Sequence, residues 1–308
     1  MLIDRYGRPL THIRISVTLR CNHNCIFCHR EGISSANSEE LTAEEWGFVA
    51  KVAIKLGIKN FKLTGGEPLV RNDIVDIVRN LVEVGGEVTM VTNASLLEKY
   101  AASLAEAGIK RINVSLHSLK PEVFKIITGG GKLEQVIKGI NAAVDSGIPL
   151  KINYLVMSVN SDEYKDIISF AESINADMNI IELIPLGLNT SEYRDLHIDL
   201  NEIEEYLEKY SVNKYVKEFQ SRTTYVLPTG IKITLVKGFL NPLMCMKCTR
   251  VRATPDGKLK TCLYREDNMV DMKPAIKARD EEKLEEMFKK INMLREPFFK
   301  PTNRVINK

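Results

Sequence analysis

Short apolar runs alternate with helix-period segments between residues 12 and 184. The runs are rich in Ile, Val and Leu, which is typical of buried parallel strands, and the segments between them have the period of amphipathic helices. Six strand–helix units are predicted, with strands at His12–Thr18, Asn60–Thr64, Val88–Thr92, Arg111–Leu116, Leu150–Val156 and Asn179–Ile184. Because crossovers between parallel strands are right-handed, this rhythm predicts an α/β fold: a partial (βα)6, TIM-like barrel.

Two of the intervening helices have predicted ends. Thr42 and Glu45 have the spacing of a capping box, so a helix should begin after Thr42. A second helix presents an apolar face from Ile74 onward and should stop at Gly85-Gly86, because glycine readily adopts the left-handed conformation that ends helices. Both apolar faces should pack on the sheet.

The pattern changes after an acidic helix near Asp199–Tyr210. A short antiparallel extension is predicted there, with strands at Lys214–Phe219, Thr223–Leu227 and Ile231–Val236. We therefore expect a core domain of residues 1–212 and a C-terminal domain of residues 213–308.

Composition limits the compartment and the partners. No run reaches the roughly 18 apolar residues of a membrane span, and the N-terminus lacks the layout of a signal peptide, so a cytoplasmic protein without membrane contact is expected. With 43 basic and 40 acidic residues the net charge is +3, which favours no nucleic-acid partner. Local basic clusters remain available for a phosphorylated ligand.

The cysteines are the most informative residues. All six fall into two triads, Cys21, Cys25 and Cys28 in the first and Cys245, Cys248 and Cys262 in the second. A reducing cytoplasm disfavours disulfides, and the short spacings bring thiolates close enough to share one inorganic centre. We predict that each triad binds a metal centre.

The first triad follows the first predicted strand, on a loop at the carboxyl edge of the sheet. Three thiolates can ligate three irons of a 4Fe–4S cubane and leave the fourth iron open to a small molecule, so Cys21, Cys25 and Cys28 are also the predicted catalytic ligands. Two alternatives stay open. One is a zinc site completed by His23 or His29, and the other is a ferredoxin-type centre, for which no fourth Cys lies nearby.

The second triad also lacks a fourth cysteine. A zinc ribbon would need another Cys or His close to Cys262, and the residues that follow offer none. A second 4Fe–4S cluster with an open iron is the favoured prediction. Arg250 and Arg252, spaced by one residue in an extended segment, should point the same way and offer a fork for phosphate.

Residues around the first triad resemble the radical S-adenosylmethionine superfamily. They are Phe27, an aromatic residue just before the third cysteine, and the Thr-Gly-Gly-Glu-Pro segment of residues 64–68. The resemblance implies that the open iron binds S-adenosylmethionine, and that an electron from the cluster splits it into methionine and a 5′-deoxyadenosyl radical.

The full layout looks like the GTP 3′,8-cyclase family of molybdenum-cofactor biosynthesis, over nearly the whole chain. It combines both triads, the Gly-Gly-Glu-Pro segment, Arg111–Leu116 and the two C-terminal arginines. The resemblance implies GTP as substrate, (8S)-3′,8-cyclo-7,8-dihydroguanosine 5′-triphosphate as product, and two 4Fe–4S clusters with S-adenosylmethionine as cofactors. It also implies an electron donor and a downstream cyclic pyranopterin monophosphate synthase, and it leaves a homodimer open.

Matching positions imply roles for single residues. Those implied for S-adenosylmethionine are Phe27, Gly66, Ser115 and Ile184. Those implied for GTP are Arg14, Lys62, Val91, Thr92, Lys151, Arg250 and Arg252. Without this resemblance, each Lys and Arg in this set would be interpreted as an ordinary surface charge.

The chain departs from the family pattern at four places. Val91 stands where the family has Thr, and Ile184 stands where it often has Met. Lys62 keeps the charge but loses the fork of the family's Arg. The given sequence ends in Val305–Lys308, where many members have a Gly-Gly tail that reaches the active site.

Two other functions stay open. One is a peptide-modifying radical maturase with an auxiliary cluster, which the presence of only three auxiliary cysteines disfavours. The other is a non-catalytic metal-cluster-binding or electron-transfer protein, which a metal count and an activity assay would distinguish.

Overall fold

The computed structural model describes residues 1–35 and 39–300. In this part of the chain one sheet contains the strands β1 (His12–Ser16), β2 (Asn60–Thr64), β3 (Glu87–Thr92), β4 (Arg111–Ser115), β5 (Leu150–Val156), β6 (Asp177–Glu182), β7 (Asn213–Val216), β8 (Thr223–Val226), β9 (Lys232–Val236), β10 (Arg250–Ala253), β11 (Lys258–Lys260) and β12 (Val270–Asp271). The α-helices are α1 (Ala43–Lys55), α2 (Ile74–Glu83), α3 (Leu97–Glu106), α4 (Pro121–Thr128), α5 (Leu133–Asp145), α6 (Tyr164–Ser173), α7 (Thr190–Leu196), α8 (Asn201–Tyr210), α9 (Pro242–Met246), α10 (Lys273–Lys277) and α11 (Glu281–Leu294).

Parallel pairing in chain order builds the centre of the sheet. Each of β1 to β5 pairs in parallel with the next strand, and the register places Arg14 opposite Lys62. The C-terminal part of the chain then extends both edges. β9 pairs in parallel with β6, and β10 pairs in parallel with β1 so that Arg252 lies opposite Arg14. Segments far apart in sequence are thereby joined in one sheet.

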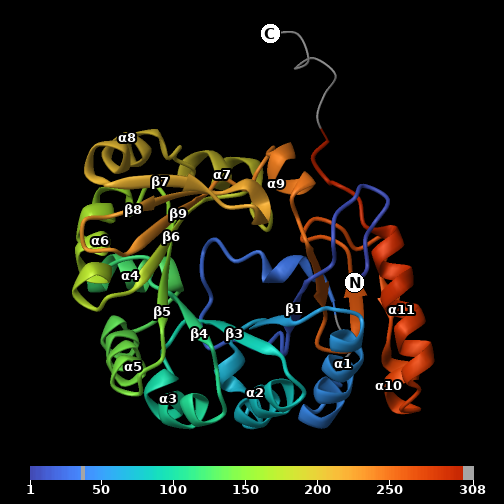
Figure 1. Ribbon diagram of the computed structural model, residues 1–308. Coiled ribbons are helices and arrows are strands. Elements are labelled where there is room, and N and C mark those ends of the chain that lie inside the picture. The colour runs from blue at the N-terminus through green and yellow to red at the C-terminus, as the bar shows by residue number, and fades with distance from the viewer. Residues whose placement is uncertain (36–38, 301–308) are drawn as a thin grey trace, which may run out of the picture.

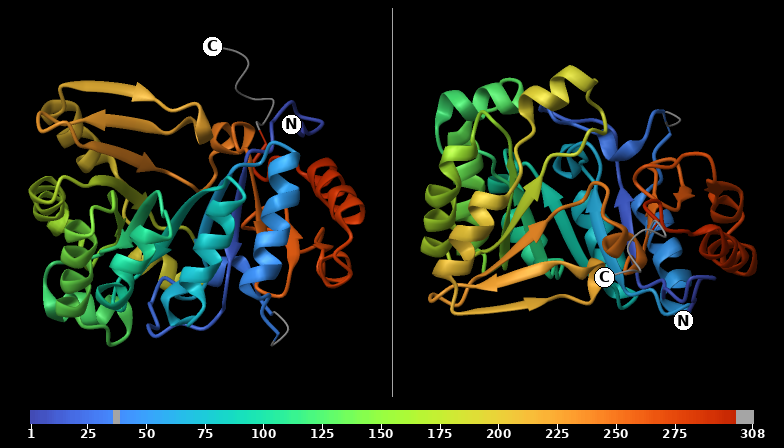
Figure 2. Two further views of the ribbon diagram at one scale, coloured as in Figure 1. Left: turned by 60° about the horizontal axis from the view of Figure 1, so that its bottom comes forward. Right: turned by 90° about the horizontal axis from the view of Figure 1, so that it is seen from above.

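Helices cover the outer side of this sheet. Figure 1 shows the strands curving through the middle of the molecule with α1 to α6 around their convex side, and the blue segment after β1 lies inside the arc. α11 packs beside α1, and both views of Figure 2 place the two together. The concave side is left to loops and to inward-pointing strand residues, and the candidate site lies there.

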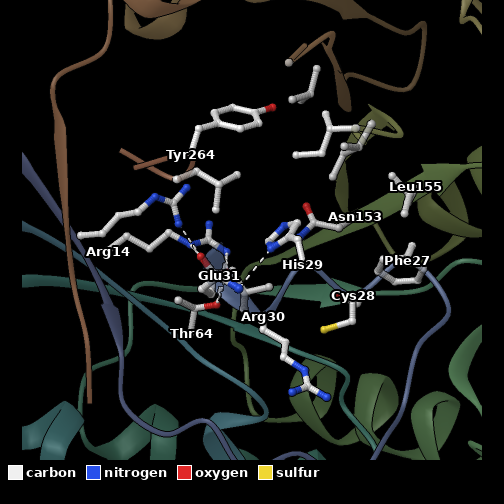
Figure 3. Close-up of a pocket in the computed structure, with 18 of the residues that line it drawn as sticks. Arg14, Phe27, Cys28, His29, Arg30, Glu31, Thr64, Asn153, Leu155 and Tyr264 are labelled. Carbon is white, nitrogen blue, oxygen red and sulfur yellow. Dashed lines mark hydrogen bonds and ion pairs between the residues drawn. The ribbon is translucent and has the colours of Figure 1, made fainter. Parts of the chain in front are cut away.

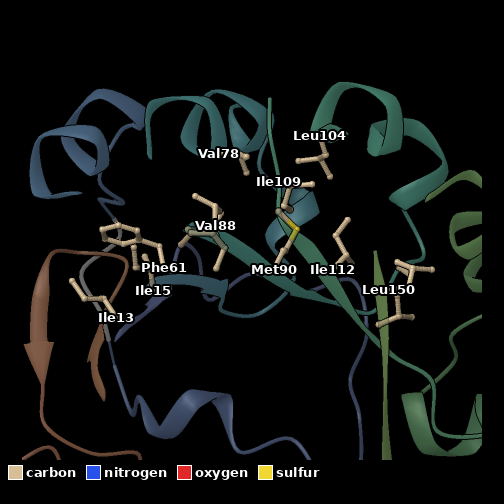
Figure 4. Packing of buried hydrophobic residues seen from close by; sticks show 14 of the residues in the cluster. Ile13, Ile15, Phe61, Val78, Val88, Met90, Leu104, Ile109, Ile112 and Leu150 are labelled. Atoms are coloured by element: carbon tan, nitrogen blue, oxygen red, sulfur yellow. The ribbon is translucent and has the colours of Figure 1, made fainter. Parts of the chain in front are cut away.

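Side chains between the sheet and the helices form the main hydrophobic core. Ile13, Phe61 and Met90, from β1 to β3, are buried and face the helices in Figure 4. α1 begins at the predicted capping box: the Thr42 side chain accepts the Glu45 N–H, and the Glu45 carboxylate accepts the Thr42 N–H. Because side chains alternate along a strand, residues between these core positions point inward.

The predicted α/β class and its six parallel strands are confirmed, and some boundaries are corrected. β6 begins at Asp177 and ends at Glu182, so Ile184 lies beyond the strand that was predicted to include it. β7 ends at Val216, and Phe219 lies in a short 3-10 turn and not in a strand. The strands β10 to β12 were not predicted.

No helix in residues 1–35 and 39–300 is both long and apolar enough to span a membrane. The C-terminal segment Val305–Lys308, where the family's Gly-Gly pair is missing, lies outside the described residues.

Candidate active site

A cavity of about 380 Å³, which we call the main cavity, opens at the carboxyl ends of the parallel strands. Both cysteine triads line it, so the loop after β1 and the segments flanking β10 and β11 meet at one space. Figure 3 shows part of this lining, with Cys28, Phe27 and Glu31 around the opening. The location agrees with the carboxyl edge at which α/β folds place their chemistry.

The first triad lies on a loop held against α4. Asn24 N–H donates to the Thr128 carbonyl at 3.0 Å, and no cysteine of the triad is in a disulfide. Burial, and then the neighbouring thiols of Cys28 and Cys21, raise the pKa of Cys25 to about 12. The thiols raise one another's pKa because they lie close together and two neighbouring thiolates would repel each other. A bound metal cation favours the thiolates and so lowers these pKa values. The triad therefore suits a shared iron–sulfur centre.

The Gly-Gly-Glu-Pro segment packs directly on this loop. A Cβ at Gly65, whose φ is +145°, would lie 2.2 Å from the Thr18 carbonyl oxygen, and one at Gly66 would lie 2.1 Å from that of Arg20. The Gly66 N–H donates to the Thr18 carbonyl at 2.8 Å. Glycine is required here because two backbones approach too closely for any side chain. The segment thus fixes the loop that carries the first triad.

Glu67 ties the same segment to β3. Its carboxylate accepts the Thr92 hydroxyl at 2.6 Å, the Asn93 N–H at 2.7 Å and the Leu69 N–H at 3.0 Å. Burial raises the pKa of Glu67 to about 7, and the three hydrogen bonds oppose the rise. The Thr92 hydroxyl also accepts the Ala94 N–H at 2.9 Å. Thr92 lines the cavity, but its hydroxyl is already committed to the fold.

Two arginines hold the backbone of the second triad. Arg8 donates to the Cys245 carbonyl at 2.8 Å, and Arg295 donates to the Cys248 carbonyl at 2.6 Å. Burial raises the pKa of Cys245, and the nearby thiols of Cys262 and Cys248 add to the rise. In the described part of the chain, no three Cys, His, Asp or Glu side chains lie close enough to hold a single metal ion. A cubane takes its thiolates at separate irons, so both triads fit a cluster.

A buried carboxylate that the sequence did not predict joins two of the predicted arginines. Glu31 accepts Arg14 at 2.9 and 2.6 Å, accepts the Thr64 hydroxyl at 3.0 Å, and pairs with Arg252. Burial alone would raise the pKa of Glu31, but the two arginines outweigh it and lower the pKa well below its usual range. Figure 3 shows the Arg14 side chain directed toward Glu31 and the Arg30 side chain directed away from it. Both Arg30 and Glu31 have positive φ, which is uncommon outside glycine and occurs mainly at functional sites.

The residues predicted for GTP are brought only partly together. Arg14, Arg250 and Arg252 line the cavity that holds both triads, as does Val91. Lys62 does not line it, and lies instead in a second cavity of about 920 Å³, which it shares with Arg250. The other predicted lysine lines neither cavity.

That second lysine, Lys151, is buried on β5. Its Nζ lies 3.5 Å from the Thr234 hydroxyl, at the limit of a hydrogen bond. Burial, and then the nearby Lys217, lower the pKa of Lys151 to about 7. Lys151 is therefore a weakly held cation inside the fold, and it is not among the residues that line the main cavity.

All residues predicted for S-adenosylmethionine line the main cavity: Phe27, Gly66, Ser115 and Ile184. The Phe27 ring meets the buried His117 edge-on at 4.8 Å. His29, one candidate fourth ligand for zinc, uses its Nδ1 to accept the Glu31 N–H at 3.1 Å. Sequence reasoning missed Glu31 and Arg222 in this lining. No local pattern marks Glu31, because its partners Arg14 and Arg252 lie 17 and 221 residues away in the sequence.

Comparison with protein families agrees with this geometry. Residues 15–171 match the radical SAM superfamily, and residues 176–300 match the family described as Molybdenum Cofactor Synthesis C. A Saccharolobus solfataricus protein named "Probable GTP 3′,8-cyclase" is 44% identical over 307 residues, which cover 97% of this chain and 99% of that protein. A Metallosphaera sedula protein of the same name is 42% identical, with 97% of each chain covered.

Solved structures support the fold. Streptococcus suis SuiB bound to its precursor peptide SuiA aligns with a TM-score of 0.66 at 17% identity, over 92% of this chain and 67% of that one. The protein anSMEcpe with bound AdoMet aligns with a TM-score of 0.65 at 13% identity, over 92% and 81%. A 4Fe–4S cluster and S-adenosylmethionine are the cofactors of radical SAM enzymes. The chain belongs to the radical SAM superfamily and, within it, to the GTP 3′,8-cyclase family.

Proposed function

We propose that the protein converts GTP to (8S)-3′,8-cyclo-7,8-dihydroguanosine 5′-triphosphate in molybdenum-cofactor biosynthesis. The observation that carries the proposal is that both cysteine triads line one cavity together with the predicted arginines Arg14, Arg250 and Arg252. Full-length relatives named as probable GTP 3′,8-cyclases support the same substrate. The product is an isomer of GTP, because the hydrogen lost from C3′ is balanced by an electron from a donor and a proton.

Cys21, Cys25 and Cys28 would hold the first 4Fe–4S cluster, which with S-adenosylmethionine supplies a 5′-deoxyadenosyl radical that removes hydrogen from C3′ of GTP. Phe27 and Ile184 line the same cavity and would offer apolar walls for S-adenosylmethionine. The backbones at residues 64–68 and 18–20 contact each other directly and hold the loop of the first triad in place. Rigid walls exclude water from a reactive radical.

Cys245, Cys248 and Cys262 would hold a second 4Fe–4S cluster with an iron open to the substrate. Arg250 and Arg252 point to the same side of β10, because both alternate with buried residues. Their guanidinium groups would bind phosphate oxygens through charge-assisted hydrogen bonds. A nucleotide held by the second triad and these arginines would lie next to the first triad, because one cavity is lined by all of them.

We assign residues 1–212 to a partial (βα)6 barrel that carries radical chemistry, and residues 213–308 to a domain for the second cluster and the substrate. The boundary rests on the change to antiparallel strands after α8, whereas the matched family models meet between residues 171 and 176. A cytoplasmic location suits six free thiols. An electron donor and a downstream cyclic pyranopterin monophosphate synthase complete the proposed pathway. The family resemblance allows a homodimer, and the mass of the protein in solution tests this assembly.

The two alternatives have less support. The peptide-modifying reading rests on structures that are under 20% identical to this chain and share only the fold. The electron-carrier reading predicts no substrate conversion. Anaerobic incubation of the reconstituted protein with GTP, S-adenosylmethionine and dithionite should yield 5′-deoxyadenosine and a product with the mass of GTP. Formation of 5′-deoxyadenosine with GTP unchanged would point to another substrate.

A further inference from the structure

Several cations on the inner side of the sheet have no acidic partner. Within the described residues, Lys62, Arg111, Arg222 and Arg250 take part in no ion pair, and the Nε atoms of Arg111 and Arg222 are enclosed without any hydrogen-bond acceptor. Arg14 differs, because Glu31 already neutralises it. The protein thus holds a set of uncompensated positive charges next to the candidate site.

Arg222 is the member of this set that the sequence did not predict as a substrate contact and that lines the main cavity. It precedes β8 and lines the main cavity together with the second triad. Its charge acts on Lys62, on Lys151 and on Arg250, all of which are predicted substrate contacts. Burial, opposed by the nearby Cys248 and assisted by Arg14, lowers the pKa of Arg222 to about 10, so the guanidinium stays charged near neutral pH. Arg222 therefore lines the main cavity and is close enough to influence two lysines that do not line it.

An aromatic ring holds Arg222 beside a second guanidinium of like charge. The Arg222 and Arg250 Cζ atoms lie 5.8 and 5.0 Å from the centroid of Phe219, which also stacks on His12 at 4.9 Å. Cation–π contacts of this kind offset part of the repulsion between the two arginines. Phe219 belongs to a turn that continues through Gln220, whose φ is +60°. The Gln220 N–H donates to the carbonyl of Lys247, which precedes Cys248 of the second triad.

An uncompensated charge inside a protein is costly, and buried charges are ordinarily paired. A set of such cations is therefore retained where an anion binds. We propose that Arg222 is a phosphate-binding residue of this site, which joins Arg250 to Lys62 in holding the polyphosphate of a nucleoside triphosphate. The identity of the nucleoside rests on the proposed function, whereas the polyphosphate contact does not.

The test compares Arg222→Gln with the parent protein, both reconstituted anaerobically. Binding of inorganic tripolyphosphate, GTP and guanosine is measured by isothermal titration calorimetry, and melting temperature is measured with and without tripolyphosphate. We expect about a 10- to 100-fold loss of affinity for GTP and tripolyphosphate, which is the usual worth of a hydrogen bond to a charged group. Guanosine affinity should stay unchanged.

Melting of the unliganded protein separates this role from a structural one. Removing an uncompensated cation should leave the melting temperature equal or higher, and should reduce the shift that tripolyphosphate causes. Phe219→Leu should weaken tripolyphosphate binding in the same direction, because it frees both guanidinium groups. Arg79→Gln is the matched control, since Arg79 is exposed on α2 and pairs with Asp76 at 2.5 Å.

Two results would overturn the inference: unchanged affinity of Arg222→Gln for tripolyphosphate, or an equal loss for guanosine together with a lower melting temperature. These results are distinct from failure of the proposed function. If the parent protein binds tripolyphosphate through Arg222 but does not cyclise GTP, the phosphate contact stands and the substrate assignment fails. If GTP is cyclised and Arg222→Gln binds it as tightly as the parent protein does, the substrate assignment stands and the phosphate contact of Arg222 fails.

Discussion

Arg14 on β1 and Glu31 on the loop after the first triad form a side-on ion pair, with Nη2 and Oε1 2.6 Å apart and Nε and Oε2 2.9 Å apart. Glu31 also pairs with Arg252, which lies opposite Arg14 in the register of β1 and β10. One carboxylate therefore joins the N-terminal and C-terminal parts of the sheet at the candidate site. It also occupies the Nε–Nη2 edge of Arg14, so only Nη1 of that arginine is left for a ligand.

Glu31→Gln should destabilise the unliganded protein. Removing one partner of a buried ion pair leaves uncompensated charge, and we expect the free energy of unfolding to fall by about 3 kcal/mol. Tripolyphosphate should restore more stability to this variant than to the parent, because the added anion replaces the lost one. Urea denaturation with and without tripolyphosphate measures both effects. Glu39→Gln, at an exposed pair with Lys273, is the control and should behave as the parent.

Cys25→Ala should abolish cleavage of S-adenosylmethionine. The remaining two thiolates cannot hold the first cluster, so iron should fall from about eight to about four per chain. Cys248→Ala is the matched variant in the second triad. It should lose a similar amount of iron but still cleave S-adenosylmethionine, without converting GTP. Full cleavage by Cys25→Ala would show that the first triad does not hold the reactive cluster.

Gly66→Ala should displace the first-triad loop. The new Cβ would lie 2.1 Å from the Arg20 carbonyl oxygen, and relieving this clash would require one of the two backbones to move. Overpacking of this kind costs about 3 kcal/mol, and binding of S-adenosylmethionine should weaken with it. Gly85→Ala is a suitable control, because its φ of +93° is strained for alanine but no atom lies within 4 Å of the new Cβ. Equal binding by both variants would contradict the backbone contact as the cause.

Affinity for tripolyphosphate should fall as the pH rises above about 7. Lys151 has its pKa lowered to about 7 by burial and then by Lys217, with Arg111 and Arg222 adding to the fall and Asp177 opposing it. The folded protein then binds fewer protons than the unfolded chain between about pH 7 and 10, so unliganded stability should rise with pH in that window. A bound anion favours the protonated form of Lys151, and it therefore binds more tightly at lower pH.

Calorimetry of tripolyphosphate binding in buffers of different ionisation enthalpy should detect this proton uptake. Lys151→Met should show less uptake and a shallower pH dependence. An identical pH dependence in the variant would assign the titration to another group.

Much of the fold was predictable because its signals are local. Strand-length apolar runs and the capping box at Thr42 depend on neighbouring residues, and both are confirmed. Pairing of β10 with β1 was not predictable in the same way, because it joins His12 to Arg250 across most of the chain and no short pattern encodes it. Boundaries failed where turns with positive φ, as at Gln220, replaced the end of a predicted strand.

The candidate site shows the same division. The cysteine spacing and the glycine pair specify their chemistry within a few residues, and the structure places both at one cavity. Family positions gave no distances, so two lysines were grouped with the arginines of the main cavity. Lys62 lines a second cavity together with Arg250, and Lys151 lines neither cavity. Glu31 and Arg222 act through partners far away in sequence, and only the folded chain reveals them.

The most direct test of the central claim follows one hydrogen atom. The reconstituted protein is incubated anaerobically with S-adenosylmethionine, dithionite and GTP carrying deuterium at C3′. We predict that 5′-deoxyadenosine gains one deuterium while GTP is converted to its cyclic isomer. Deuterium-free 5′-deoxyadenosine, or label retained in unchanged GTP, would contradict radical abstraction from C3′ at this site.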